Sequence, residues 1–165
     1  MGGVLLTDGS QTAWVAMEER FGLPALETER IWYDELQRPG DLGEISEDDM
    51  WERLCSLLPG REPSEVRQVL LDEYQPIDQG IEALRSAHAA GWQVLLATNN
   101  VGTWVDYWMG KYDWMRLPSG IICSSEIGVR KPDPEFYESV RIRIEGDPSY
   151  FVDDKVENLE PAISA

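Results

Sequence analysis

The chain has 165 residues, a formal net charge of −17 at pH 7 and an isoelectric point near 4.3. With 42% apolar and 10% aromatic residues it can form the core of one ordinary domain. Nucleic acids and anionic membranes are recognised largely through clusters of Lys and Arg, so we expect this acidic chain to bind neither. Acidic runs such as Glu47-Asp48-Asp49 are interpreted as solvated helix faces.

The two cysteines, Cys55 and Cys123, lie far apart in apolar segments and match no metal-binding spacing. Two free thiols are typical of a protein in a reducing cytosol. No apolar run approaches the length of a membrane span, and the N-terminus lacks the basic start and apolar stretch of a signal peptide. The sequence therefore predicts a cytoplasmic protein.

Residues 11–75 are predicted to be helical throughout. Apolar positions recur there at three- and four-residue spacing, as in the Trp-x-x-Met-x-x-x-Phe run that begins at Trp14. Gly and Pro pairs divide the segment into about four helices. Ser46 with Asp49 resembles a capping box that opens one of them.

From residue 76 onward, short apolar strands alternate with helices, a pattern typical of an α/β fold with a parallel sheet. The predicted elements are a helix at Ile81–Ala90, a strand at Val94–Ala97, a helix at Val101–Met109, a strand at Gly120–Cys123, a helix at Pro134–Ile144, a strand at Tyr150–Val152 and a helix from Val156 to the end. Val4–Leu6 is consistent with the end of a further strand.

Polar side chains follow the predicted strands where they end. Thr98 and Asn99 follow the first, Lys131 comes after the second, and Asp153 with Asp154 follows the third. Reactive groups of doubly wound sheets collect at the carboxyl ends of the strands, so these side chains are expected to meet at one edge. A hydroxyl, an ammonium group and two carboxylates suit a phosphoryl group together with Mg²⁺.

Three segments, Leu95–Asn100, Lys131–Tyr137 and Phe151–Asn158, resemble the second, third and fourth motifs of the haloacid dehalogenase-like superfamily. The resemblance implies a Rossmann-like core, here residues 1–10 and 76–165, with an inserted α-helical cap, here residues 11–75. It also implies a phosphohydrolase that binds Mg²⁺ and attacks phosphorus with an aspartate, forming an aspartyl-phosphate.

The family's first motif is an apolar strand that ends in this aspartate, and one subgroup continues it as Asp-x-Gly-Gly-Val-Leu. The chain begins Met-Gly-Gly-Val-Leu, which places the nucleophile directly before Met1. We therefore expect a core truncated at both ends, because the family's fold also continues past Ala165, and a form without turnover. In a second alignment, Asp8 would be the acid-base residue of an Asp-x-Asp-Gly motif and Leu6 would replace the nucleophile.

The resemblance implies a role for each matching residue. Thr98, Lys131 and Asp154 would be catalytic, and Thr98, Asn99 and Lys131 would bind the phosphorylated substrate. Asp153 and Asp154 would hold Mg²⁺. Asn158 is expected to orient the acidic pair.

The implied substrate is a small phosphorylated metabolite, and the oligomeric state is left open, with a homodimer as one alternative. The alternative functions are a pseudoenzyme that binds phosphate or metal and, more weakly supported, a haloacid dehalogenase, whose reaction needs no metal. His88 is expected at a helix end without a catalytic role. Trp32, Tyr33 and Trp51 are interpreted as packing between cap and core. Trp104, Tyr107 and Trp108 share one helical face and are interpreted as packing against the sheet or a subunit.

Overall fold

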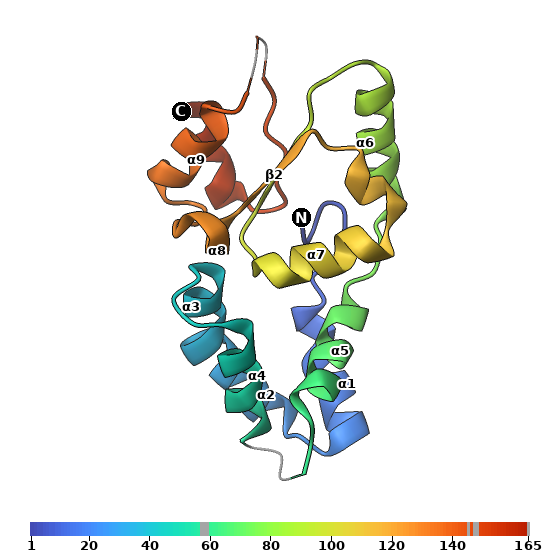
Figure 1. The fold of residues 1–165 in the computed structure, drawn as a ribbon, viewed down its shortest axis with the longest axis vertical. Helices are drawn as coiled ribbons and strands as arrows, with labels where there is room; N and C mark the ends of the chain where they lie inside the picture. Colours follow the sequence, from blue (N-terminus) through green and yellow to red (C-terminus); the bar gives the residue numbers. More distant parts are fainter. Residues whose placement is uncertain (57–59, 145, 147–148, 165) are drawn as a thin grey trace.

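The computed structural model describes residues 1–165 except 57–59, 145, 147–148 and 165. Figure 1 shows an elongated molecule with helices α1 to α5 at one end and the later elements at the other. The elements of the first end are α1 (Ser10–Phe21), α2 (Ala25–Ile31), the π-helical turn η1 (Trp32–Leu36), α3 (Gln37–Asp41), α4 (Glu47–Cys55) and α5 (Pro63–Glu73).

The second end contains a parallel pair of strands and the remaining helices. Its elements are α6 (Asp78–Ala89), β1 (Leu95–Thr98), α7 (Gly102–Lys111), the 3₁₀ turn η2 (Asp113–Arg116), β2 (Gly120–Cys123), α8 (Ser124–Ile127), α9 (Pro134–Arg141), the 3₁₀ turn η3 (Val156–Asn158) and α10 (Leu159–Ser164). Leu95 of β1 is level with Gly120 of β2, and Thr98 with Cys123. An α/β fold with a parallel sheet is thereby confirmed.

Helices α2, η1 and α3 form one continuous helical stretch from Ala25 to Asp41. Within the described residues, the helical segment therefore contains four such stretches, as the sequence predicts. Pro39 lacks an amide hydrogen, so it cannot continue the regular hydrogen-bond pattern, and the π-helical turn lies just before it. The capping box is confirmed: Asp49 N donates to Ser46 Oγ at 3.1 Å, and Ser46 N donates to Asp49 Oδ2 at 3.2 Å.

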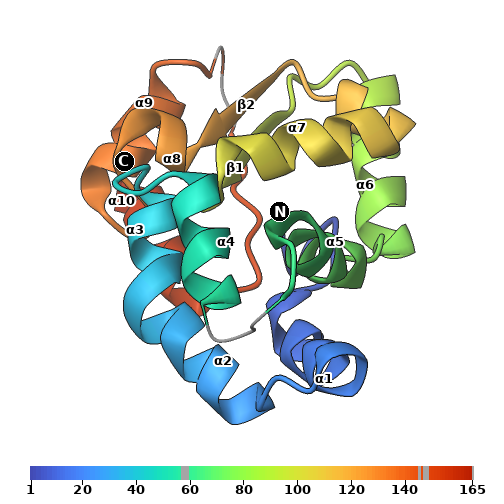
Figure 2. The same ribbon diagram turned by 60° about the horizontal axis from the view of Figure 1, so that its bottom comes forward.

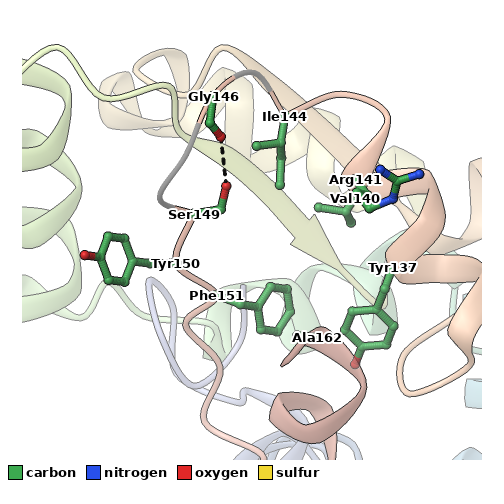
Figure 3. Close-up of a pocket in the computed structure, with 9 residues that line it drawn as sticks. All are labelled: Tyr137, Val140, Arg141, Ile144, Gly146, Ser149, Tyr150, Phe151 and Ala162. Atoms are coloured by element: carbon green, nitrogen blue, oxygen red, sulfur yellow. Dashed lines mark hydrogen bonds between the residues drawn. The ribbon is translucent and has the colours of Figure 1, made fainter. Parts of the chain in front are cut away.

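The predicted strand at Tyr150–Val152 is wrong, because the structure has no strand there. Tyr150 contacts Trp92, with ring centroids 5.5 Å apart, and Phe151 contacts Tyr137, at 5.6 Å. Figure 3 shows the side chains of Tyr150 and Phe151 pointing to opposite sides of the chain. Strand assignment needs a hydrogen-bonded neighbour, and among the described residues β1 pairs only with β2. The apolar pattern therefore predicted the side-chain alternation but not the missing pairing.

The end of a strand expected at Val4–Leu6 is also not formed. Residues 3–5 make a turn, and Leu6 forms isolated bridges to Gly2 and to Pro76. These bridges tie the first residues of the chain to the segment that follows α5. The division into a cap at residues 11–75 and a core around it stays a prediction.

The two ends of the molecule pack through an aromatic stack. Trp32 of η1 lies between Trp51 of α4, at 5.9 Å between ring centroids, and Trp104 of α7, at 5.6 Å. Each stacked pair contributes roughly 1 kcal/mol beyond its buried area. Trp32 and Trp51 therefore pack against Trp104 of α7, so they join the helical segment to the later elements, and Trp104 packs on them rather than on the sheet. Tyr33 is 41% exposed.

A backbone contact completes this junction. Gly43, between α3 and α4, has φ +69°, and a Cβ added to it would lie 2.3 Å from the carbonyl oxygen of Ser125 in α8. Any side chain at this position would push the two segments apart. Figure 1 and Figure 2 show the end of α3 lying beside α8.

Candidate active site

Lys131 lies in the loop between α8 and α9, and its side chain contacts both the end of β1 and the segment that contains Asp153. Its Nζ donates to the carbonyl oxygen of Ala97 in β1 at 3.0 Å and to Asp153 Oδ2 at 2.6 Å. The side chain of Lys131 is 6% exposed and that of Asp153 is 5% exposed. A buried ammonium and a buried carboxylate at this distance form a strong charge-assisted pair.

Asn99 fixes the backbone of Lys131. Its Oδ1 accepts from Lys131 N at 2.8 Å, and its Nδ2 donates to Lys131 O at 2.9 Å. Both polar atoms of the Asn99 side chain thus contact the lysine backbone. Thr98, the last residue of β1, is buried beside it at 1% exposure.

Asp153 is held by neighbours on both of its oxygens. Oδ1 accepts from Asn158 Nδ2 at 2.8 Å and from Lys155 N at 2.9 Å, while Oδ2 faces Lys131. Burial raises the pKa of Asp153, but the hydrogen bonds from Lys131 and Asn158 outweigh it, so the net pKa lies below the ordinary value. Asn158, which was expected to orient the acidic pair, thus contacts one member of it, Asp153. Tyr137, which sequence reasoning missed, donates to Asn158 O at 2.9 Å.

Asp154 is exposed and lies against the start of the chain. A Cβ added to Gly3, whose φ is +76°, would lie 2.2 Å from Asp154 Cγ, so only a glycine leaves room for this carboxylate. The α-amino group of Met1 is buried in the same place: desolvation and then Lys131 lower its pKa to about 5, whereas Asp153 and Asp154 act in the opposite direction. A residue attached before Met1 would therefore lie among these charged groups.

The cluster fits Mg²⁺ in its donor type. Mg²⁺ is usually held by one or two carboxylates together with water and phosphate oxygens. Asp153 and Asp154 supply two adjacent carboxylates, and Gly3 provides the space in which Asp154 lies. Within the described residues, no three His, Cys, Asp or Glu side chains form a metal-binding group, so Mg²⁺ would need further ligands.

Helix α3 contributes a buried carboxylate that contacts Arg130, the residue before Lys131. Asp41, at the end of α3, is 6% exposed, and its Oδ2 lies 3.3 Å from Nη2 of Arg130. Asp41 lines a cavity of about 30 Å³ between cap and core, together with Trp32, Gln37, Met50, Tyr74, Asn99, Asn100, Val101 and Trp104. Burial raises the pKa of Asp41 to about 6, although Arg130 and Lys155 lower it.

Glu47 is a second cap residue that contacts the core. Its carboxylate accepts from Trp51 Nε1 at 2.9 Å, from Arg67 Nε at 2.6 Å and from Thr103 Oγ1 of α7. The interpretation of its acidic run as solvated holds for Asp48 and Asp49, which are exposed, and is wrong for Glu47. Neither Asp41 nor Glu47 could be found from sequence, because both lie in a helical segment with many other acidic residues.

Other candidates lie outside the cluster. Asp8 Oδ1 accepts from Ser10 Oγ at 2.7 Å and from Ser10 N at 3.3 Å, at the start of α1. His88 is exposed in the last turn of α6, as expected. A larger cavity of about 360 Å³ lies between α9 and Phe151 (Figure 3), and neither Lys131 nor Asp153 lines it.

The model of one protein family matches residues 6–165, and its description is "haloacid dehalogenase-like hydrolase". This chain belongs to that family. It is 32% identical over 167 residues to the sesquiterpene phosphatase astK of Aspergillus oryzae, covering 96% of this chain and 80% of the relative. The family assignment from three sequence motifs is thereby confirmed.

Two solved structures are similar in fold. One is a haloacid dehalogenase family enzyme from Bacteroides thetaiotaomicron, with a TM-score of 0.80, 14% identity, and coverage of 99% of this chain and 86% of the other. The second is described as a dehalogenase, with a TM-score of 0.68, 16% identity, and coverage of 98% and 76%. At these identities the likeness concerns the fold alone. No helix in the described part of the chain is long and apolar enough to cross a membrane.

Proposed function

We propose that this chain carries the phosphate and metal side of a Mg²⁺-dependent phosphatase that hydrolyses phosphate monoesters through an aspartyl-phosphate. The observation that carries the proposal is the buried contact of 2.6 Å between Lys131 Nζ and Asp153 Oδ2 at the end of β1. The similarity to a phosphatase over 96% of the chain supports the same reaction class.

Each residue has a role in this proposal. Lys131 neutralises charge on the nucleophile and the phosphoryl group, Asn99 holds the lysine backbone in place, and Thr98 donates to a phosphoryl oxygen. Asp153 and Asp154 hold Mg²⁺, with Asp154 acting directly or through water. When bound, the metal stabilises negative charge on the transferring group.

The nucleophilic carboxylate belongs, in this proposal, at the position before Met1. The burial of the Met1 amino group near Lys131, Asp153 and Asp154 supports that placement. The chain as printed has no carboxylate there, so we propose that this form has no turnover.

We further propose that the substrate is a small phosphorylated metabolite with an apolar alcohol. The relative named as a sesquiterpene phosphatase supports this class. Two free thiols are consistent with action in the cytoplasm.

A second candidate is a phosphate- or metal-binding protein without turnover. The observation that favours it is that, among the described residues, the carboxylate in contact with Lys131 is Asp153, which the proposal assigns to the metal rather than to attack on phosphorus. A haloacid dehalogenase has no comparable support, because the similarity to a dehalogenase is at 16% identity.

The test supplies the missing carboxylate. An apolar strand ending in Asp is fused directly before Met1, and a matched control ends in Asn. With p-nitrophenyl phosphate, we expect Mg²⁺-dependent phosphate release from the Asp form, abolished by EDTA, and none from the Asn form or the printed chain. A panel containing farnesyl phosphate and glucose 6-phosphate then tests the preference for an apolar alcohol. If the folded Asp form hydrolyses no ester and gains no Mg²⁺ affinity by calorimetry, the binding-protein alternative replaces the phosphatase.

A further inference from the structure

The first residues of the chain bring no proton donor to the proposed phosphate site. Gly2 and Gly3 follow the nucleophile position, and Asp154 occupies the space beside Gly3. Lys131 and Asp153 are engaged with each other at 2.6 Å. A phosphate ester with a poor leaving group needs a proton on its leaving oxygen, so another residue must supply it.

Asp41 is placed to reach that oxygen from the cap. It lines the cavity that Asn99 also lines, and Asn99 holds the backbone of Lys131. In an in-line displacement the leaving oxygen points away from the nucleophile. The nucleophile position precedes Met1, whose amino group lies among Lys131, Asp153 and Asp154. Lys155 interacts electrostatically with both that amino group and Asp41, so a leaving oxygen directed toward the cap would approach Asp41.

We propose that Asp41 is the general acid that protonates the leaving alcohol in this reaction, an assignment that rests on the proposed phosphatase function. The attacking carboxylate forms a bond to phosphorus while the bond between phosphorus and the ester oxygen breaks. The ester oxygen takes the Asp41 proton and leaves as the alcohol. In the second step Asp41, now a carboxylate, removes a proton from the water that hydrolyses the aspartyl-phosphate, which restores its acid form.

The surroundings of Asp41 suit this cycle. Arg130 contacts it at 3.3 Å, and Lys155 also lowers its pKa, whereas burial raises the pKa to about 6. Tyr74 and Cys123 interact electrostatically with Asp41 as neutral groups. Burial is the main cause that raises the pKa of each, and Asp41 adds to it, although hydrogen bonds with Ser125 lower the pKa of Cys123. A carboxyl group that titrates near neutral pH can both give and take a proton.

The experiment compares leaving groups in the Asp-extended protein. The alcohol of p-nitrophenyl phosphate leaves without help, whereas that of an alkyl phosphate needs protonation. We expect Asp41→Asn to lower kcat for the alkyl phosphate about 100-fold and for p-nitrophenyl phosphate less than about 5-fold. The descending high-pH limb of kcat against pH for the alkyl phosphate should disappear in the same variant.

Arg130→Gln is the matched control, because it breaks the same cap–core contact and keeps the acid. We expect it to preserve the difference between leaving groups and to move the high-pH limb upward, since Arg130 lowers the pKa of Asp41. Equal losses on both substrates in both variants would show that Asp41 only holds the cap. If Asp41→Asn does not fold, Asp41→Glu replaces it, and recovery of alkyl phosphate turnover is expected.

A second arm uses the chain as printed and needs no turnover. The carboxyl carbons of Asp and Glu are labelled, and Asp41 is titrated by NMR with and without methyl phosphate and Mg²⁺. A dianion held beside Asp41 should raise its pKa by about one unit, whereas Glu44, which is exposed in the same region, should not shift. An unchanged Asp41 titration with bound methyl phosphate would overturn the assignment. An inactive Asp-extended protein would instead count against the phosphatase function.

Discussion

Glu47, the first residue of α4, accepts a hydrogen bond of 2.5 Å from the indole Nε1 of Trp104 in α7. The same carboxylate also receives Trp51 and Arg67 from the cap, and Thr103 from the core. One acidic side chain therefore connects two cap helices to the helix that follows β1. The stack of Trp32 on Trp104 lies next to it, so the position of the cap depends on both contacts.

Glu47→Gln should weaken this junction. The variant loses charge-assisted hydrogen bonds from several donors and places an amide NH₂ against them, which costs about 2 kcal/mol of the free energy of unfolding. Urea unfolding followed by tryptophan fluorescence measures this loss, and the folded-state emission should also change because Trp51 and Trp104 lose a partner. Asp48→Asn, at the exposed neighbouring position, should change the unfolding free energy by less than about 0.5 kcal/mol. Equal effects of the two substitutions would contradict the role of Glu47.

Sequence reasoning recovered the local elements and the family because both depend on short-range pattern. The strand at Gly120–Cys123 is found at its predicted bounds, and the capping box at Ser46 forms as expected. The contact between Lys131 and Asp153 was predicted from the positions of both residues after apolar segments, because parallel strands bring their carboxyl ends to one edge of the sheet.

The remainder depends on contacts between distant segments. Whether Tyr150–Val152 becomes a strand depends on backbone hydrogen bonds to a neighbouring strand, and the apolar residues of the segment itself carry no information about that neighbour. Asp41 and Asp48 are both acidic residues of helical segments, yet one is 6% exposed and the other is open to solvent. Only the packing of α3 against the core distinguishes them.

Lys131→Met should destabilise the chain strongly at neutral pH. The substitution leaves the buried Asp153 carboxylate without its cation, which costs about 3 kcal/mol in the free energy of unfolding. Urea unfolding at pH 7 tests this, and the double variant with Asp153→Asn should recover part of the loss because the unpaired charge is gone. If the double variant is less stable than Lys131→Met alone, the contact at 2.6 Å does not determine the stability of this site.

The two thiols should react slowly and in a fixed order. Burial raises the pKa of both Cys55 and Cys123, so little thiolate forms at pH 7. Cys55 is partly exposed, whereas Cys123 is 1% exposed and its Sγ donates to Asn100 O at 3.1 Å. Iodoacetamide labelling followed by peptide mass spectrometry should modify Cys55 first, and Cys123 only at a rate that increases with urea. Faster labelling of Cys123 in native buffer would contradict its burial.

The raised pKa of Asp41 makes a prediction about stability that is independent of catalysis. Its pKa is about 6 in the folded chain, against an ordinary value near 3.9 in the unfolded chain. The folded state therefore binds this proton more tightly, and the stabilisation is fully present below about pH 4 and is lost as pH rises through about 6. The whole loss amounts to about 3 kcal/mol for a shift of this size, of which about 2 kcal/mol falls between pH 4 and pH 7. Asp153, whose pKa is lowered, acts with the opposite sign: its contribution to the stability of the fold is lost as pH falls, so the measurement must isolate Asp41.

The difference in unfolding free energy between the printed chain and Asp41→Asn isolates Asp41, because every other titrating group is common to both proteins. That difference should fall by about 2 kcal/mol between pH 4 and pH 7 in urea titrations. The unpaired Arg130 in the variant adds a constant offset, since its charge does not change in this range. A difference that stays flat from pH 4 to pH 7 would mean that Asp41 titrates as an ordinary carboxylate, and it would then be unable to serve as the acid near neutral pH.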